Sequence, residues 1–117
     1  MCMRIGCDIV AISRIDTIYQ KHGNAFLDKF LNKNEQKLIK SSSTLAGFWA
    51  AKEAVSKALG VGISKECGFL DIEILKDSKN APYLKLSSHV LENFKINSTS
   101  LSISHDNGFA IAVVALD

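Results

Sequence analysis

The chain has 117 residues, of which 47% are apolar and 22% are charged, as in an ordinary soluble globular protein. Its length suits one compact domain over residues 1–117. Fourteen basic and twelve acidic residues give a net charge of +2, which excludes a dedicated polycation of the kind that binds nucleic acid non-specifically. Seven of the basic residues but only four of the acidic ones fall within residues 1–40, so the first third of the chain is mildly basic.

The N-terminal residues lack the apolar run and small-residue cleavage site of a signal peptide. The longest apolar run, residues 109–116, is too short to span a membrane. Cys2, Cys7 and Cys67 form no Cys-x-x-Cys pair and are expected to be free thiols in a reducing compartment. We therefore expect a cytoplasmic protein without a membrane or nucleic-acid partner.

The first third of the chain predicts one strand followed by three helical stretches. Residues 3–10 alternate as in a strand, with Ile5, Cys7 and Ile9 on one face and Asp8 on the other. A helix is expected from Ser13, as its capping residue, to about Lys21. Further helical stretches are expected over residues 25–31 and from about residue 34 to the serine-rich joint at residues 41–44.

The middle of the chain predicts one long helix over residues 44–59. Apolar residues cover most of its circumference, which is typical of a helix surrounded by the rest of the fold. Gly60 ends this helix, and Gly62 gives the following turn its flexibility.

The remaining third predicts a second strand pair, a short helix and a final hairpin. Leu70, Ile72 and Ile74 alternate with acidic residues in a strand with one dry face, and residues 83–86 form the returning strand. The short helix covers residues 88–95, and its inward residues are expected to be Val90, Leu91 and Phe94. Asp106-Asn107-Gly108 is a strong hairpin turn between residues 101–105 and 109–116. The fold class is thus α+β, with a mainly antiparallel sheet packed against one long central helix.

Glu53 and Lys57 are the first candidates for a functional role. At i and i+4 they share a helix face, and an exposed ion pair of little energetic value is the ordinary interpretation. Trp49, one turn earlier, and the neighbouring alanines indicate partial burial, where a carboxylate needs a partner or a cation. Spacing alone leaves both interpretations open.

Asp8 is the second candidate. Taken alone, it fits a solvent-facing carboxylate on a half-exposed strand. If the strand passes beside the long helix, Asp8 and Glu53 supply the two carboxylates that commonly hold Mg²⁺ with substrate phosphates, and Lys57 neutralises phosphate charge.

Three other features each have a structural and a functional interpretation. The Gly60-Val61-Gly62 turn either caps the helix or lets backbone amides approach phosphate, and His105 is either a packing residue at a strand end or a ligand contact. Arg14, Ile18 and Lys21 form either a solvated helix face or a docking surface for an acidic partner.

Three segments in order resemble one family. Residues 5–10 with Arg14-Ile15 are similar to the opening of the holo-[acyl-carrier-protein] synthases. Residues 49–60, Trp-Ala-Ala-Lys-Glu-Ala-Val-Ser-Lys-Ala-Leu-Gly, are similar to their central signature, and residues 102–105 followed by 110–112 are similar to their closing hairpin. The resemblance implies the 4'-phosphopantetheinyl transferase fold. It also implies transfer of phosphopantetheine from coenzyme A to a serine of apo acyl carrier protein, with release of adenosine 3',5'-bisphosphate, as in fatty acid biosynthesis.

The resemblance further implies roles for individual residues. Asp8 and Glu53 would bind Mg²⁺, Lys57 would contact the phosphates, and Glu53 would help to remove the serine proton. Gly60 and Gly62 would line the nucleotide pocket, with Pro82 and His105 near the adenosine. Arg14, Ile18 and Lys21 would receive the carrier protein, and the family implies a homotrimer whose active sites lie between subunits.

Two positions depart from the family pattern. Phe48 stands where many relatives have an arginine, and Asn80-Ala81-Pro82 replaces the usual Gly-Lys-Pro.

The alternative from another functional class is a non-catalytic module that binds an acidic protein through residues 14–40.

Overall fold

The computed structural model describes residues 3–117, so the expectation for Cys2 lies outside the described residues. In chain order the elements are β1 (Arg4–Ala11), α1 (Ile12–His22), α2 (Asn24–Phe30), α3 (Lys33–Gln36), α4 (Ser42–Leu59), the 3₁₀ turn η1 (Phe69–Asp71), β2 (Ile72–Lys76), β3 (Pro82–Leu86), α5 (Ser88–Phe94), β4 (Thr99–Asp106) and β5 (Phe109–Leu116). None of these helices is long and apolar enough to cross a membrane.

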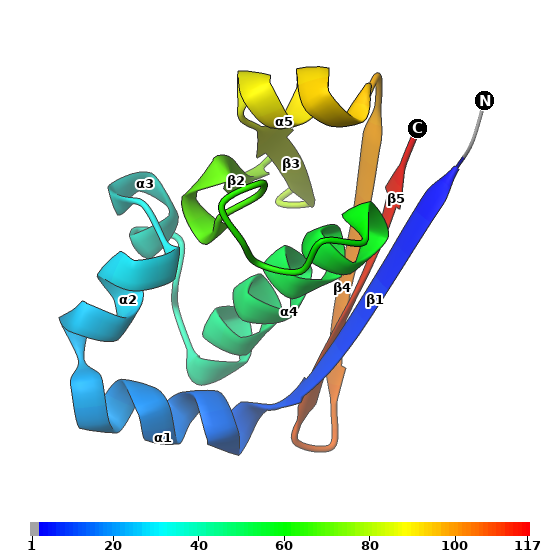
Figure 1. Cartoon of the computed structure of the whole chain (residues 1–117). Coiled ribbons are helices and arrows are strands. Elements are labelled where there is room, and N and C mark those ends of the chain that lie inside the picture. Colours follow the sequence, from blue (N-terminus) through cyan, green and yellow to red (C-terminus); the bar gives the residue numbers. More distant parts are fainter. Residues whose placement is uncertain (1–2) are drawn as a thin grey trace.

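Two antiparallel sheets make up the β-structure, with strand orders β1-β5-β4 and β2-β3. The long helix α4 packs on the inner face of the three-stranded sheet, while α1, α2 and the β2-β3 hairpin surround its other sides (Figure 1). The predicted α+β class with a central helix on an antiparallel sheet is confirmed. The strand pairs predicted at residues 70–86 and 101–116 belong to different sheets.

Helix α4 ends at Leu59 as its sequence predicts, but it starts at Ser42, two residues earlier than expected. The Ser41 hydroxyl accepts a hydrogen bond from the Thr44 amide at 3.2 Å and caps the first turn. Gly60 ends the helix in the left-handed region at φ = +78°. Eleven of its eighteen residues are buried, which confirms the expectation of a largely covered helix.

Strand β1 approaches α4 very closely at Gly6. A Cβ atom built on Gly6 would lie 1.9 Å from the carbonyl oxygen of Ala54 and 2.7 Å from the amide nitrogen of Ala58. Glycine is therefore required here for the strand to lie against the helix backbone. This contact sets the position of Asp8, two residues further along the same strand face.

The outer face of the three-stranded sheet carries apolar side chains that no element within residues 3–117 covers. Ile5 and Ile9 on β1 are 63% and 61% exposed, and Phe109 and Val113 on β5 lie on the same face. The alternation predicted for residues 3–10 is confirmed. However, the Asp8 face points toward α4 and the apolar Ile5–Cys7–Ile9 face points away, so the interpretation of Asp8 as a solvent-facing side chain is wrong.

Several local expectations are wrong for identifiable reasons. Ser13 does not cap α1, because the strand runs directly into the helix and the Ile12 amide donates to the carbonyl of Gly108 in the hairpin turn, at 2.9 Å. Leu70 is 60% exposed, since it belongs to η1 and strand β2 begins only at Ile72. Leu91 is exposed on α5, and the third predicted helix is shorter than expected, ending at Gln36.

Candidate active site

Asp8, Glu53 and Lys57 come together where β1 crosses α4. The Lys57 ammonium donates to Asp8 Oδ1 at 2.7 Å and to the carbonyl oxygen of Cys7 at 3.3 Å. Asp8 is largely buried, with 14% of its side chain exposed, whereas the Lys57 side chain is 53% exposed. Lys57 thus pairs with a carboxylate on the neighbouring strand rather than with Glu53 on its own helix.

The electrostatics of Glu53 distinguish it from an ordinary surface carboxylate. Partial burial, and next the neighbouring Asp8 carboxylate, raise the pKa of Glu53 above its usual range, while Lys57 and Arg14 act in the opposite direction. The pKa of Lys57 is itself raised, mainly by its hydrogen bond to Asp8. Within residues 3–117, no side-chain or backbone donor is bonded to the Glu53 carboxylate. The site therefore holds two adjacent carboxylates, one of which lacks a protein partner.

The two carboxylates of Asp8 and Glu53 suit Mg²⁺, which needs few protein ligands, better than a metal ion that the protein must enclose completely. No group of three or more His, Cys, Asp or Glu side chains within residues 3–117 could enclose an ion. Mg²⁺ is commonly bound by one or two carboxylates and takes its remaining oxygens from water and substrate phosphates. A cation at this place would also relieve the repulsion between Asp8 and Glu53.

Pro82 and His105 lie apart from these three residues. They line a cavity of about 270 Å³ together with Ser43, Thr44, Gly47, Phe48, Lys76, Asn80 and Ile103. The registers Asp8–Ala112–Ile103 and Val10–Ala110–His105 place Asp8 on one edge strand and His105 on the other. Helix α4 lies over β5 between them, so the two parts of the predicted site are on opposite sides of this helix within one chain.

Gly60 and Gly62 follow the end of α4. Both have positive φ values, +78° and +64°, and both are exposed, with open space where a Cβ would lie. The left-handed conformation of Gly60 confirms the predicted helix cap. The two glycines also leave the backbone accessible for contact with a ligand.

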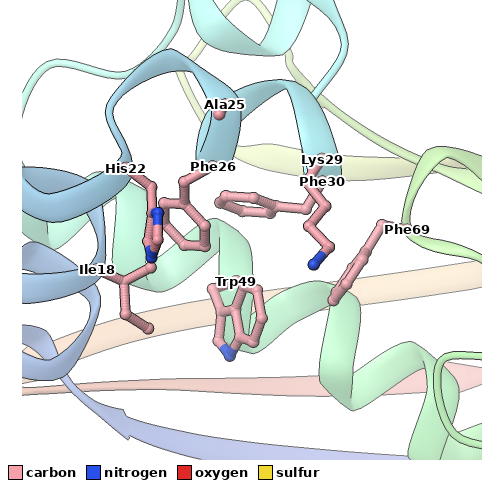
Figure 2. A pocket seen from close by; sticks show the side chains of 8 residues that line it. All are labelled: Ile18, His22, Ala25, Phe26, Lys29, Phe30, Trp49 and Phe69. Atoms are coloured by element: carbon pink, nitrogen blue, oxygen red, sulfur yellow. The ribbon is translucent and has the colours of Figure 1, made fainter.

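Helix α1, the predicted docking helix, lies beside Glu53 and also lines a second cavity. Arg14 and Lys21 are exposed, and Arg14 lies close enough to Glu53 to affect its pKa. One turn further along α1, Ile18 lines a cavity of about 410 Å³ with His22, Ala25, Phe26, Lys29, Phe30, Trp49 and Phe69. Figure 2 shows these side chains converging on the cavity from α1, α2, α4 and η1.

Comparison with known proteins assigns the chain to a family. Residues 4–114 match the family model described as the 4'-phosphopantetheinyl transferase superfamily. A Campylobacter jejuni holo-[acyl-carrier-protein] synthase is 68% identical over 114 residues, which cover 97% of this chain and 99% of the relative. The chain belongs to the holo-[acyl-carrier-protein] synthases of this superfamily. It is accordingly an enzyme, a transferase.

Solved structures agree with this assignment. The crystal structure of the Helicobacter pylori holo-[acyl-carrier-protein] synthase in complex with coenzyme A has a TM-score of 0.94 at 53% identity, covering 97% of this chain and 99% of that one. A Bacillus anthracis synthase in complex with CoA (3',5'-ADP) has a TM-score of 0.82 at 38% identity, covering 98% and 97%. The predicted 4'-phosphopantetheinyl transferase fold is confirmed.

The departures from the family signature have clear positions in this synthase. Phe48 is 1% exposed and cannot present charge to a ligand. Lys76, at the end of β2, is the lysine that lines the same cavity. Asn80 adopts a positive φ of +65° in the turn before β3, a conformation that asparagine tolerates better than most residues.

Sequence reasoning missed one buried group in the synthase signature. Lys52 is fully buried, and its ammonium bonds to Glu35 Oε1 at 3.0 Å and to the carbonyl oxygens of Phe30 and Phe69 at 2.6 and 3.1 Å. The signal available in the sequence was a lysine within an otherwise apolar helix. The sequence does not indicate its partners, which lie 17 and 22 residues away.

Proposed function

We propose that this enzyme transfers the 4'-phosphopantetheine group of coenzyme A to a serine of apo acyl carrier protein in a Mg²⁺-dependent reaction that releases adenosine 3',5'-bisphosphate. The observation that carries the proposal is the junction of Asp8, Glu53 and Lys57 between β1 and α4. Two carboxylates and an ammonium suit a metal-bound pyrophosphate. The relatives named holo-[acyl-carrier-protein] synthase support the same donor and acceptor.

The roles of the three residues follow from their surroundings. Asp8 and Glu53 would hold Mg²⁺, which when bound supplies charge neutralisation for the pyrophosphate. Lys57, exposed beside them, contacts the phosphate oxygens. The serine oxygen attacks the phosphorus that bears pantetheine, and the bond from this phosphorus to the oxygen of the departing bisphosphate breaks. Glu53 accepts the serine proton.

The nucleotide is proposed to extend into the cavity lined by Pro82 and His105. In this cavity Lys76 would supply positive charge to the 3'-phosphate, taking the place of the arginine that Phe48 replaces. Gly60 and Gly62 would let the backbone approach the phosphates from the end of α4. The apolar cavity beside Trp49 is about one helical turn from Glu53, about 6 Å along the axis, and suits the pantetheine arm.

A homotrimer with active sites between subunits is proposed from the separation of these parts. One nucleotide cannot pass from Asp8 to His105 beneath α4, because the helix backbone touches the strand at Gly6. The nucleotide cavity of one subunit would instead face the carboxylates of the next. The uncovered apolar face around Ile5, Ile9 and Val113 supports a subunit contact on this sheet.

The acidic carrier protein is proposed to dock on α1. Arg14 and Lys21 place exposed positive charge on either side of Ile18 along this helix. Because Arg14 also lies near Glu53, a protein bound here would present a serine close to the proposed metal site. The whole chain would act as one transferase domain in the cytoplasm, in fatty acid biosynthesis.

The test is the intact mass of an apo acyl carrier protein after incubation with the enzyme, coenzyme A and Mg²⁺. The expected result is a phosphopantetheine adduct that requires Mg²⁺ and disappears with Glu53→Gln, while circular dichroism shows an unchanged fold. Near-normal transfer by Glu53→Gln would contradict the role of this carboxylate. Absence of an adduct with the unaltered enzyme on every carrier tested would favour the non-catalytic module that binds an acidic protein through residues 14–40.

A further inference from the structure

The buried Lys52 ammonium uses all its donors on groups from three other elements. It donates to Phe30 at the end of α2, to Glu35 on α3 and to Phe69 in η1. An ammonium has three N–H bonds, so its hydrogen-bonding capacity is filled. Glu35 is equally satisfied, because Oε1 also accepts from the Asn32 amide at 2.9 Å and Oε2 accepts from the Ile74 amide at 3.0 Å.

Two of the three acceptors belong to the wall of the apolar cavity. The ring of Phe30 lies 5.2 Å from that of Trp49 in an edge-on arrangement, and the ring of Phe69 lies 5.0 Å from Trp49 on another side. In Figure 2 the rings of Phe30, Phe69 and Trp49 border the same space. Lys52 therefore bonds the backbones of two wall residues that are 39 positions apart in the sequence.

A contribution to stability alone explains this arrangement poorly. A buried ion pair is often no more stabilising than apolar side chains of similar volume, because both charges must leave water. The side chains of Lys52 and Glu35 are 0% and 1% exposed, so both charges have lost their contact with water. An apolar residue at this position could fill the space, but it could not hold the carbonyl oxygens of Phe30 and Phe69.

We propose that Lys52 is a positioning residue that fixes the width of the cavity by holding Phe30 and Phe69 against Trp49. This inference rests on the proposed function, in which the cavity receives the pantetheine arm. Lys52 touches no substrate. It acts through the two aromatic walls and leaves the chemistry to Glu53, the next residue on α4, whose side chain lies at the junction with β1.

Binding of two ligands separates this role from general stability. Coenzyme A carries the arm, whereas adenosine 3',5'-bisphosphate lacks it. We expect Lys52→Met to weaken binding of coenzyme A by about tenfold, which corresponds to about 1.4 kcal/mol, while binding of the bisphosphate changes less than about twofold. With coenzyme A in transfer assays, KM should rise while kcat at saturation stays within about twofold, since Asp8, Glu53 and Lys57 are intact.

Trp49 supplies a spectroscopic readout that needs no ligand. It is the single tryptophan of the chain and lies in the cavity wall. Loss of the two carbonyl contacts should loosen Phe30 and Phe69, expose the indole and shift its emission to longer wavelength. Lys33→Met is the matched control, because it removes an exposed lysine from a neighbouring ion pair with Asp28 and should change neither emission nor binding.

A double variant keeps the proposal testable if Lys52→Met folds poorly through the unpaired Glu35 charge. Lys52→Met with Glu35→Gln removes both charges, so we expect it to recover thermal stability but not coenzyme A affinity or the original emission of Trp49. Recovery of affinity and emission in the double variant would overturn the proposal, since Lys52 would then only neutralise Glu35. Equal weakening of both ligands would overturn it as well.

The proposed function can fail separately. If the unaltered enzyme binds neither ligand and transfers nothing, the assignment of the cavity to the pantetheine arm is wrong. The emission of Trp49 in the single and double variants would still decide whether Lys52 holds the cavity walls.

Discussion

Gly6→Ala tests whether the contact between β1 and α4 aligns the active site. The added methyl carbon would lie 1.9 Å from the Ala54 carbonyl oxygen, and both atoms are bound to backbone, so neither can turn away. The strand and helix must separate by about 1.5 Å to restore an ordinary contact. A shift of this size takes the 2.7 Å contact between Asp8 and Lys57 beyond good hydrogen-bonding distance.

The expected costs can be measured on stability and transfer separately. Insertion of a methyl group into close packing costs about 1–3 kcal/mol, and a misplacement of about 1 Å at a reacting centre can lower the rate about a hundredfold. Thermal unfolding reports the first quantity, and the initial rate of carrier modification by intact mass reports the second.

A matched alanine substitution on α4 provides the control. A Cβ at Gly47 would meet only a side-chain methyl group of Ile103, at 2.9 Å, and this methyl group can move while the helix backbone stays in place. Gly47→Ala should therefore lose little of the alignment between Asp8 and Glu53. Because Gly47 and Ile103 also line the cavity proposed for the nucleotide, the two variants are compared at saturating coenzyme A. Wild-type transfer by folded Gly6→Ala would refute the idea that this contact positions the carboxylates.

Three further changes test the remaining assignments. Burial raises the pKa of Glu53 in the folded chain, so the stability from this group is present below its ordinary pKa of 4.5 and is lost as pH rises through the raised pKa. Glu53→Gln should therefore raise Tm by about 2 °C at neutral pH and leave it unchanged at acidic pH. The same Tm for Glu53→Gln and the unaltered enzyme at neutral pH would contradict this. Lys76→Met should raise KM for coenzyme A about tenfold but leave KM for dephospho-coenzyme A, which lacks the 3'-phosphate, unchanged. Lys79→Met, at an exposed lysine, is the control. Equal changes in KM for both donors would exclude contact between Lys76 and the 3'-phosphate. Ile9→Glu should convert the proposed trimer to monomers, as measured by light scattering, and abolish transfer. Leu70→Glu, at a similarly exposed leucine outside the three-stranded sheet, should do neither. An intact trimer in Ile9→Glu would exclude the outer face of this sheet as the subunit contact.

The sequence predicts most of the fold because its local signals are strong. Gly60 adopts the left-handed cap that a helix end followed by glycine predicts, and Asn107 and Gly108 have the positive φ values of a two-residue hairpin loop. The pair of Asp8 and Glu53 was also predictable, given that the strand lies beside the helix. These features depend on residues close in the sequence or on one strand-helix contact.

The direction in which β1 faces could not be predicted from its alternation. Period-two patterning separates Ile5 and Ile9 from Asp8 but does not say which set meets α4. A single chain normally buries its more apolar face. Here the backbone contact at Gly6 directs the other face to the helix, and the apolar face is left for the subunit contact that we propose.

The polar side chains of α4 differ in whether the fold itself supplies their hydrogen-bond partners. Lys52 is satisfied by three acceptors, and the Ser56 hydroxyl is satisfied by the Glu53 carbonyl at 2.7 Å, so both have their partners within the chain. Among the residues that the structure describes, the partly buried Glu53 carboxylate has no such partner, and its pKa is raised. A buried polar group that the fold does not satisfy costs free energy unless a ligand completes it. A cation and a phosphorylated substrate bound at the Glu53 carboxylate would therefore offset the largest part of this free-energy cost on α4.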